Sequence, residues 1–414
     1  MRASRRLRQR LQQQLAQHEQ AGLRRQRLVR AGPCSSSQTF DGRPRLTFCS
    51  NDYLGLANHP ELIKAFHDGA QRYGVGSGAS ALVTGHCQAH EQLEEELADF
   101  MGRDRALLFA TGYMANMGVI NALTPPGALL FQDALNHASL LDGGWLSRGQ
   151  SLRYPHVDTA ALRDMLGQHT AAGDGDGDGL IVSDGVFSMD GDFAPLMELV
   201  ALADQSGLAL MVDDAHGIGC LGEQGRGTLE QVVNDAGRQG LLTQDDVPVL
   251  VGTFGKAFGT AGAFVAGDRD LIDFLEQFAR THMFSTAMPP ALAEATRASL
   301  RLIQREAWRR ERLRDLIAQF RRGALQLGLT LLPSSTPVQA VMLGSIERAV
   351  GASALLREQG IQVSAIRPPT VPRGQARLRI TLSAAHTAEQ VDRLLDGLCQ
   401  VARWLETTAS DAGE

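Results

Sequence analysis

Lysine is almost absent from this chain of 414 residues: only Lys64 and Lys256 occur. Arginine supplies the other positive charge. Arginine stays protonated in proteins, so it cannot serve as an amine nucleophile. Cysteine is also scarce: the five residues are odd in number and irregularly spaced, which argues against a disulfide framework and favours a reducing cytoplasmic location. No apolar run approaches the ~18 residues of a membrane span. A net charge of −6 argues against nucleic acid as the main partner.

One of the two lysines, Lys256, lies where an amine nucleophile is useful. Its segment 251–259 (VGTFGKAFG) joins a buried apolar run to a tight turn between glycines. A lysine desolvated on such a turn can attack a carbonyl and form a Schiff base. A surface lysine on a turn is the ordinary alternative, and Lys64 lies in a plain amphipathic stretch. The small apolar neighbours of Lys256 favour the nucleophile.

A second motif ends the apolar run of segment 208–217 (LALMVDDAHG). The run is typical of a buried parallel strand, and Asp213, Asp214 and His216 follow at its end. Ligands of open α/β sheets bind outside the carboxyl ends of the strands. A carboxylate there could pair with the ring nitrogen of pyridoxal phosphate held by Lys256. The spacing alone leaves both aspartates open, and a metal site is the weaker interpretation because it leaves Lys256 unexplained.

Five further segments complete a recognisable set. They are 51–56 (NDYLGL), 74–78 (GVGSG), 111–113 (TGY), 137–139 (HAS) and 185–192 (GVFSMDGD). In this order and spacing they resemble the α-oxoamine synthases, fold-type I pyridoxal-phosphate enzymes that condense an amino acid with an acyl thioester and release carbon dioxide. The resemblance runs from about Leu23 to the last helix. Segment 365–372 (AIRPPTVP) is similar to the 8-amino-7-oxononanoate synthases of biotin biosynthesis.

The resemblance implies roles for four catalytic residues. Lys256 would hold pyridoxal phosphate and act as the base once substrate has displaced it. Asp213 would pair with the ring nitrogen and keep it protonated. His216 would contact the phenolic oxygen. His137 would stack on the pyridine face, where it also borders the substrate.

Further cofactor contacts follow from the same resemblance and from the chemistry of phosphate binding. A phosphate needs backbone N–H groups at a helix start or hydroxyl groups. Gly112 and Tyr113 follow a strand and open a helix, and Thr253 lies three residues before Lys256. Ser188 would be a further contact. Asp184 stands where relatives often carry a longer acid, and we assign it no catalytic role.

The substrate carboxylate calls for an arginine that can bind it with two hydrogen bonds. Arg379 matches the family position, and Asn51 would assist it. Arg377 is the alternative, because two residues apart on a regular strand share one face. Arg24 and Thr370 match acyl-substrate positions.

The resemblance implies a homodimer that joins pimeloyl-CoA, or the pimeloyl-acyl-carrier protein, to L-alanine and gives 8-amino-7-oxononanoate, carbon dioxide and the free thiol carrier. Sibling synthases that use glycine or serine are the alternatives within the family, and segment 367–372 speaks against them. These siblings are 2-amino-3-oxobutyrate ligase, 5-aminolevulinate synthase and serine palmitoyltransferase. A non-catalytic subunit of the same fold is a third possibility. The joint presence of Lys256, Asp213 and His216 speaks against it. Arg25 adjoins Arg24, so either could contact the substrate.

Strand-like runs alternate with helical stretches, which predicts an α/β fold with a largely parallel sheet covered on both faces. We expect an N-terminal helix and arm over 1–45, a large cofactor-binding domain over 46–288 and a smaller α+β domain over 289–414. One long helix is expected over 291–327. Leu7, Leu11 and Leu15 fall four residues apart, which predicts an amphipathic N-terminal helix, and the resemblance implies that this helix packs across the dimer.

Three motifs have plainer interpretations than their patterns suggest. Segment 174–179 (DGDGDG) begins like a calcium loop but has Gly185 where an EF-hand needs glutamate, so we expect a polar loop. His86, Cys87 and His90 match no zinc spacing and are expected to lead into a helix. Segment 74–78 (GVGSG) follows a helix rather than a strand, which excludes a dinucleotide-binding loop.

Overall fold

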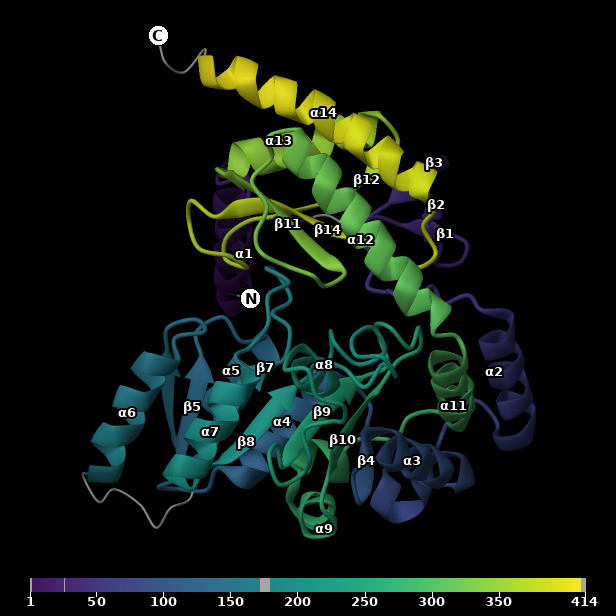
Figure 1. Cartoon of the computed structure of the whole chain (residues 1–414), viewed down its shortest axis with the longest axis vertical. Coiled ribbons are helices and arrows are strands. Elements are labelled where there is room, and N and C mark those ends of the chain that lie inside the picture. Colours follow the sequence, from purple (N-terminus) through teal and green to yellow (C-terminus); the bar gives the residue numbers. More distant parts are fainter. Residues whose placement is uncertain (1, 26, 172–178, 411–414) are drawn as a thin grey trace.

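The structure, a computed structural model, describes residues 2–25, 27–171 and 179–410, and its larger part is built on a seven-stranded sheet (Figure 1). The strand order is β4-β10-β9-β8-β7-β5-β6, and every strand is parallel to the others except β10. The strands are β4 (Arg105–Phe109), β5 (Leu129–Asp133), β6 (Gln150–Tyr154), β7 (Gly179–Asp184), β8 (Ala209–Asp213), β9 (Val249–Thr253) and β10 (Ala263–Gly267). The predicted largely parallel sheet is confirmed.

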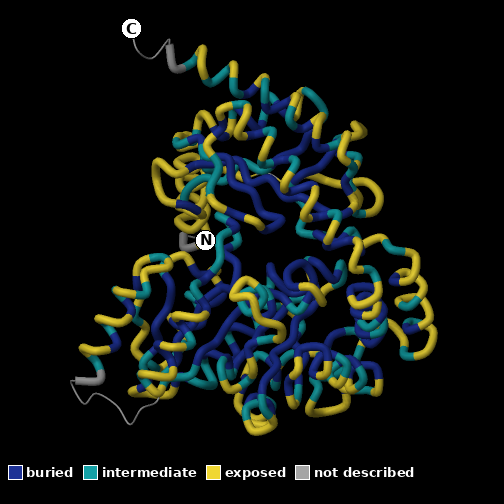
Figure 2. The backbone as a smooth tube through the Cα atoms, in the orientation of Figure 1, coloured by how far each residue is buried: buried dark blue, intermediate teal, exposed yellow. Residues whose placement is uncertain are grey.

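Both faces of this sheet are buried along its strands, as Figure 2 shows, except at the edge strand β6, which is mostly exposed. Successive side chains of a strand point to opposite faces, so Leu180 and Val182 join one apolar cluster while Ile181 joins the other. One cluster includes residues of α4 (Gly112–Leu123), α5 (Ala138–Leu146) and α9 (Arg269–Phe278), and the other those of α3 (Gln88–Met101), α6 (Thr159–Ala171) and α7 (Leu196–Ser206). Burial on both sides explains why the inner strands β7, β8, β9 and β10 are nearly continuous apolar runs.

A smaller part, at the top of Figure 1, carries a three-stranded antiparallel sheet. Its strands are β11 (Val338–Gly344), β14 (Ala376–Thr381) and β13 (Ser364–Ile366), and its helices are α12 (Trp308–Gln326), α13 (Ile346–Glu358) and α14 (Ala388–Ser410). A second sheet combines strands from the N-terminal and C-terminal thirds of the chain, in the order β1-β2-β3-β12. Its strands are β1 (Arg30–Ala31), β2 (Ser37–Phe40), β3 (Arg43–Thr47) and β12 (Ile361–Gln362). Leu46 pairs with Ile361 in parallel. The domain boundaries at 45 and 288 stay a prediction.

The expectation of one helix over 291–327 is wrong. Two helices, α11 (Pro290–Arg305) and α12, are separated at Glu306, whose φ of −108° and ψ of 59° are not helical. Glu306 receives ion pairs from Arg305 at 3.2 Å and from Arg309 at 2.7 Å. The break lets α11 lie along α2 (Pro60–Tyr73) while α12 continues into the smaller part (Figure 1).

The predicted N-terminal helix is α1 (Arg2–Gln20), and its leucine stripe is uncovered in the single chain. Leu7, Leu11 and Leu15 are about half exposed, at 48%, 48% and 54%. Short helices elsewhere are η1 (Ala81–Gly85), α8 (Thr228–Asp235) and α10 (Arg280–Met283). In the described ranges, none of the helices combines the length and the apolar character that a membrane crossing needs. Residues 174–178 of the predicted polar loop lie outside those ranges.

Candidate active site

The predicted site residues gather at the carboxyl ends of the parallel strands. Gly112 and Tyr113 follow β4, His137 follows β5 and Ser188 follows β7. Asp213 ends β8 and Thr253 ends β9, and His216 and Lys256 lie three residues beyond these two ends. Neighbouring parallel strands end at one edge of a sheet, which is where such folds bind ligands. Arg379 reaches the same place from β14 of the smaller part, because its guanidinium contacts Asn51 and the carbonyl of Ser188. The site therefore lies between the two parts.

The two adjacent aspartates, between which the spacing left the choice open, have different surroundings. Asp213 accepts hydrogen bonds from Asn116 Nδ2 at 2.6 Å and from the backbone N–H of Ala215 at 3.0 Å. Asp214 is fully buried and accepts from the backbone N–H of Thr228 at 2.7 Å. Burial raises the pKa of Asp214 to about 8, so its carboxyl is largely neutral at pH 7. The geometry supports Asp213 as the ligand-facing carboxylate.

Lys256 and Lys64 differ as the sequence predicts. Lys64 is exposed on α2 and pairs with Asp68 one helical turn away. Lys256 lies on the turn after β9 and is only partly exposed. Its burial lowers its pKa, although the charges of Asp213 and Asp184 oppose the change. A lysine with a lowered pKa has more of the neutral amine that nucleophilic attack requires.

His216 belongs to a buried network that ends at Arg379. Its Nδ1 lies 2.7 Å from the hydroxyl of Tyr53, and Tyr53 donates to Asn51 Oδ1 at 3.2 Å. Arg379 donates to the same oxygen of Asn51 at 3.2 Å. Burial and the charges of Lys256 and Arg379 lower the pKa of His216 well below its usual range, so its imidazole is neutral. The network holds the arginine beside the strand ends.

His137 is fixed by its position at the start of α5. Its side chain accepts from the backbone N–H of Ser139, and its own backbone N–H donates to Asp184 at 2.6 Å. Burial raises the pKa of Asp184 well above its usual range. The imidazole of His137 itself is exposed toward Tyr113, with ring centroids 6.4 Å apart. Asp184 therefore fixes the backbone of His137, while the exposed imidazole has a face that is free to contact a ligand.

Gly112, Tyr113 and Thr253 form a small polar cradle. Thr111 caps α4 by accepting the backbone N–H of Met114 at 3.1 Å. The first N–H groups of a helix have no partner within it, so those of Gly112 and Tyr113 can serve an anion. A Cβ added to Gly112 would lie 3.7 Å from the hydroxyl oxygen of Thr253. The hydroxyl and the helix start therefore face the same small space.

Arg24, Arg25 and Thr370 line a cavity of about 740 Å³ between the N-terminal arm and the smaller part. Arg25 Nη2 donates to the hydroxyl of Thr370 at 2.7 Å, whereas Arg24 pairs with Glu19. Arg367 fastens the arm by donating to the carbonyls of Gly22 and Arg24 at 2.9 and 3.1 Å. The arginine that contacts Thr370 is therefore Arg25, whereas the choice between Arg24 and Arg25 as the substrate contact stays a prediction.

Comparisons with known proteins show the family of the chain. A family model described as aminotransferase class I and II matches residues 43–398. The 8-amino-7-oxononanoate synthase of Pseudomonas putida (strain W619) is 54% identical over 398 residues, which are 96% of this chain and 98% of the relative. The chain belongs to the 8-amino-7-oxononanoate synthases. The synthase of Methylococcus capsulatus is 56% identical over 90% of this chain and 93% of its own length.

Solved structures confirm the fold-type I architecture for this member of the synthases. A variant of Serine Palmitoyltransferase from S. paucimobilis with a bound PLP–myriocin aldimine has a TM-score of 0.87 at 28% identity, covering 96% of this chain and 98% of that one. The 8-amino-7-oxononanoate synthase from Francisella tularensis has a TM-score of 0.73 at 29% identity, covering 87% and 98%. Both cover the larger and the smaller part together.

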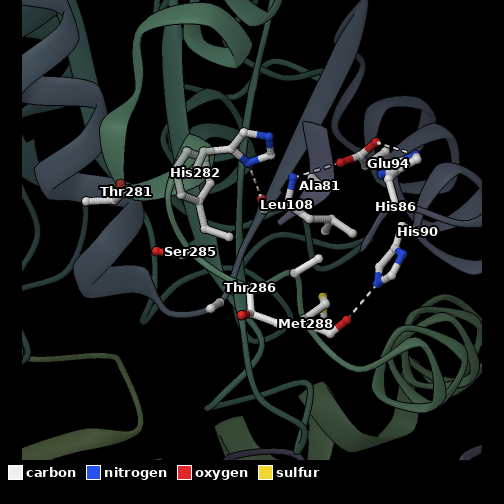
Figure 3. Close-up of a pocket in the computed structure, with 13 residues that line it drawn as sticks. Ala81, His86, His90, Glu94, Leu108, Thr281, His282, Ser285, Thr286 and Met288 are labelled. Carbon is white, nitrogen blue, oxygen red and sulfur yellow. Dashed lines mark hydrogen bonds and ion pairs between the residues drawn. The ribbon is translucent and has the colours of Figure 1, made fainter. Parts of the chain in front are cut away.

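A separate small pocket contains the His86–His90 motif (Figure 3). His90 Nε2 lies 2.8 Å from the carbonyl of Met288, and His282 Nδ1 lies 3.2 Å from the carbonyl of Leu108. His90 and His282 thus each have a partner on the backbone, whereas His86 Nε2 lies 2.8 Å from the carboxylate of Glu91. Cys87 is the N-cap residue of α3. The interpretation of this segment as the start of a helix in the synthase is confirmed.

Three supporting residues escaped the sequence analysis. Asn116 holds Asp213, Tyr53 holds His216, and Asp184 holds the backbone of His137. Asn116 gives one usable signal, because it is a buried polar residue in the apolar helix α4, and such residues need a partner. Tyr53 lies in the NDYLGL segment but has no distinguishing spacing. These roles depend on contacts between distant segments, which the sequence does not reveal.

Proposed function

We propose that this chain is an acyltransferase that joins a pimeloyl thioester to L-alanine in biotin biosynthesis, giving 8-amino-7-oxononanoate, carbon dioxide and the free thiol carrier. The observation that carries the proposal is 54% identity with a synthase of this name, against 28% with a serine palmitoyltransferase of equal coverage. Incubation of the purified chain with pyridoxal phosphate, pimeloyl-CoA and L-alanine should yield the product by mass spectrometry. Failure to form it under conditions where the cofactor binds would contradict the proposal.

The donor set fits pyridoxal phosphate. Lys256 supplies the amine, Asp213 the acid for the ring nitrogen, and His216 and Ser188 further contacts. Gly112, Tyr113 and Thr253 would hold the phosphate with two N–H groups and a hydroxyl. His137 leaves an exposed ring for stacking. The chemistry of each donor matches one functional group of the cofactor.

The bound cofactor supplies an electron sink for the negative charge that forms at the alpha carbon of alanine. Lys256 takes up the alpha proton, and its lowered pKa suits a base near neutral pH. Asp213 holds a proton on the ring nitrogen through its negative charge. Asn116 and the N–H of Ala215 keep this carboxylate oriented.

Arg379 binds the alanine carboxylate in this proposal. Its Nε donates to the carbonyl of Ser188 at 2.6 Å, and Nη1 donates to Asn51 at 3.2 Å. These bonds fix the plane of the guanidinium before substrate arrives, which lowers the ordering cost of binding. Arg377 is engaged elsewhere, because it forms an ion pair with Asp190 and is 1% exposed. The same strand thus offers one structural and one substrate-binding arginine.

The acyl donor is expected to reach the cavity beside Thr370. Because Arg25 contacts Thr370 and Arg24 pairs with Glu19, Arg25→Ala should raise the KM for pimeloyl-CoA by about tenfold, the effect of roughly 1.4 kcal/mol of lost binding. Arg24→Ala should change it by less than about threefold. Steady-state kinetics with saturating alanine would distinguish them. A larger effect of Arg24→Ala would return the substrate contact to that residue.

We further propose a homodimer. Several apolar side chains that are exposed in the single chain lie on or beside the helices η1, α10, α4 and α5. Of these helices, η1 contacts α10, α10 contacts α4, and α4 contacts α5. The side chains are Leu82, Val83, Phe284, Tyr113, Trp145 and Leu146. Exposed apolar side chains on neighbouring helices are typical of a protein interface. The uncovered leucine stripe of α1 adds a second surface for the partner.

The dimer makes a direct prediction. Trp145 is 85% exposed, and a charge placed there would have to be buried on association. Trp145→Glu should therefore shift sedimentation from the mass of two chains toward one. Leu325→Glu, at an exposed position of α12 outside this surface, is the matched control and should stay dimeric. A wild-type chain that is monomeric and fully active would contradict the proposal.

A further inference from the structure

A short hairpin, segment 186–193, lies between the two parts of the molecule. Val186 pairs with Phe193, and the backbone N–H of Phe187 donates to the carbonyl of Asp192 at 3.0 Å. At its turn, the carbonyl of Gly191 accepts from the hydroxyls of Ser334 and Thr336 in the smaller part, at 2.8 and 3.1 Å. The hairpin starts directly after β7 of the large sheet. It therefore connects the catalytic edge of that sheet to the smaller part.

Both arginines of β14 rest on this hairpin. Arg377 pairs with Asp190, and Arg379 Nε donates to the carbonyl of Ser188 at 2.6 Å. The bond from Nε is one of three polar contacts that orient the guanidinium of Arg379, with those to Asn51 and Tyr53. A displacement of the hairpin would therefore turn the proposed carboxylate-binding group.

His156 fixes the opposite side of the hairpin. Its Nδ1 lies 2.9 Å from Asp133 at the end of β5, and its Nε2 lies 2.9 Å from Asp192 in the hairpin. Its ring also packs edge-on against Phe187, with centroids 4.4 Å apart. Asp133 is 1% exposed and accepts the backbone N–H groups of Leu135 and Val157 as well, at 2.7 and 2.8 Å. Asp133, which ties His156 to the large sheet, is therefore held in place by two backbone N–H groups in addition to His156.

The two partners of His156 determine its protonation. Ionised carboxylates only accept hydrogen bonds, so both ring nitrogens must carry protons. Burial lowers the pKa of His156, but the bonds with Asp133 and Asp192 outweigh burial and raise it to about 10. Asp190 also lies close enough to form a possible ion site with His156 and Asp192. A doubly protonated imidazole has no lone pair for a metal, so the cluster is better described as an ion bridge.

We propose that His156 is a positioning residue for the amino-acid site: its bridge from Asp133 to Asp192 fixes the hairpin that orients Arg379. Neither the sequence motifs nor the proposed reaction assigns it a role. It does not touch the substrate or the cofactor in this account and acts only through the hairpin. The inference rests on the proposed role of Arg379 in binding alanine.

The test is alanine binding by the cofactor-loaded protein, followed through the absorption change on adding L-alanine without acyl thioester. His156→Gln should raise the Kd for alanine by about tenfold, which corresponds to about 1.4 kcal/mol of lost binding. The KM for pimeloyl-CoA should change by less than about twofold, because neither the hairpin residues nor Arg379 line its cavity. Asp192→Asn in the His156→Gln background should restore part of the affinity, because it removes the unpaired carboxylate.

A neighbouring variant separates positioning from stability. Val157 has a φ of 50°, a left-handed conformation that costs a β-branched residue strain. Val157→Asn keeps the backbone N–H that donates to Asp133 and should raise the melting temperature by about 1–3 °C. It should leave the Kd for alanine unchanged. If His156→Gln does not fold, Asp192→Ala alone breaks the same bridge, because alanine has no acceptor for His156 Nε2, and it should weaken alanine binding.

The outcomes are distinct. A raised Kd for alanine with an unchanged KM for pimeloyl-CoA supports the inference. Wild-type affinity in His156→Gln, or a loss of folded protein with unchanged affinity in the folded fraction, overturns it. A wild-type protein that gives no spectral change with alanine would instead overturn the proposed function on which the inference rests.

Discussion

Replacing Lys256 with alanine is expected to lower kcat by at least about 10²- to 10⁴-fold, the range contributed by a positioned general base. The variant also loses the amine that would hold pyridoxal phosphate. An arginine cannot take over the role of Lys256, because the guanidinium stays protonated. The other lysine, Lys64, is exposed on α2. Initial rates with saturating pimeloyl-CoA and alanine measure the effect.

Lys64→Ala is the matched control, because it removes the only other lysine in the chain. It should retain the wild-type rate. Borohydride reduction of the loaded wild type, followed by peptide mapping, should place the cofactor on the peptide that holds Lys256. A label on Lys64, or a Lys256→Ala variant with near-normal turnover, would remove the basis of the assignment.

Asp213→Asn is expected to cost more than roughly 10²-fold in kcat, beyond the usual loss of one electrostatic contact. A neutral amide cannot stabilise the proton on the ring nitrogen. The fold should survive, because the oxygen of the new amide can still accept the N–H of Ala215. Asn116 can turn its own amide so that its oxygen, which has no partner, accepts from the new NH2 group. Thermal unfolding and kinetics on the same sample separate folding from turnover.

Asp214→Asn provides the adjacent control. Burial raises the pKa of Asp214 to about 8, so an amide resembles the neutral acid that predominates at pH 7. Asp214→Asn should therefore keep most of the activity, within about tenfold of wild type. A near-normal rate in Asp213→Asn together with a large loss in Asp214→Asn would exchange the two roles.

The sequence predicted the parts of the site that depend on strand ends. Buried parallel strands are apolar runs, so the polar residues that follow them, such as Asp213 and Lys256, stand out along the chain. Because parallel strands end at one edge, their proximity followed from the fold class. The roles of these residues remain predictions, although the geometry brings them together.

Contacts between distant segments could not be predicted in the same way. Thr370 and Arg25 are 345 residues apart, and only the folded arm shows that Arg25 rather than Arg24 reaches the hydroxyl. Leu46 pairs with Ile361 through a parallel strand contact that no local pattern signals. The break at Glu306 also escaped, because the helical pattern continues across it. Tertiary contacts decided each of these features.

The central claim is the choice of substrates, and a matched panel tests it most directly. Alanine, glycine and serine would each be assayed with pimeloyl, acetyl, succinyl and palmitoyl thioesters. Some turnover of glycine is expected, because one methyl group is worth only about 1–3 kcal/mol of discrimination. The account predicts the highest kcat/KM for alanine with the pimeloyl thioester. A higher kcat/KM for glycine with acetyl or succinyl, or for serine with palmitoyl, would contradict it and assign the chain to the corresponding sibling synthase.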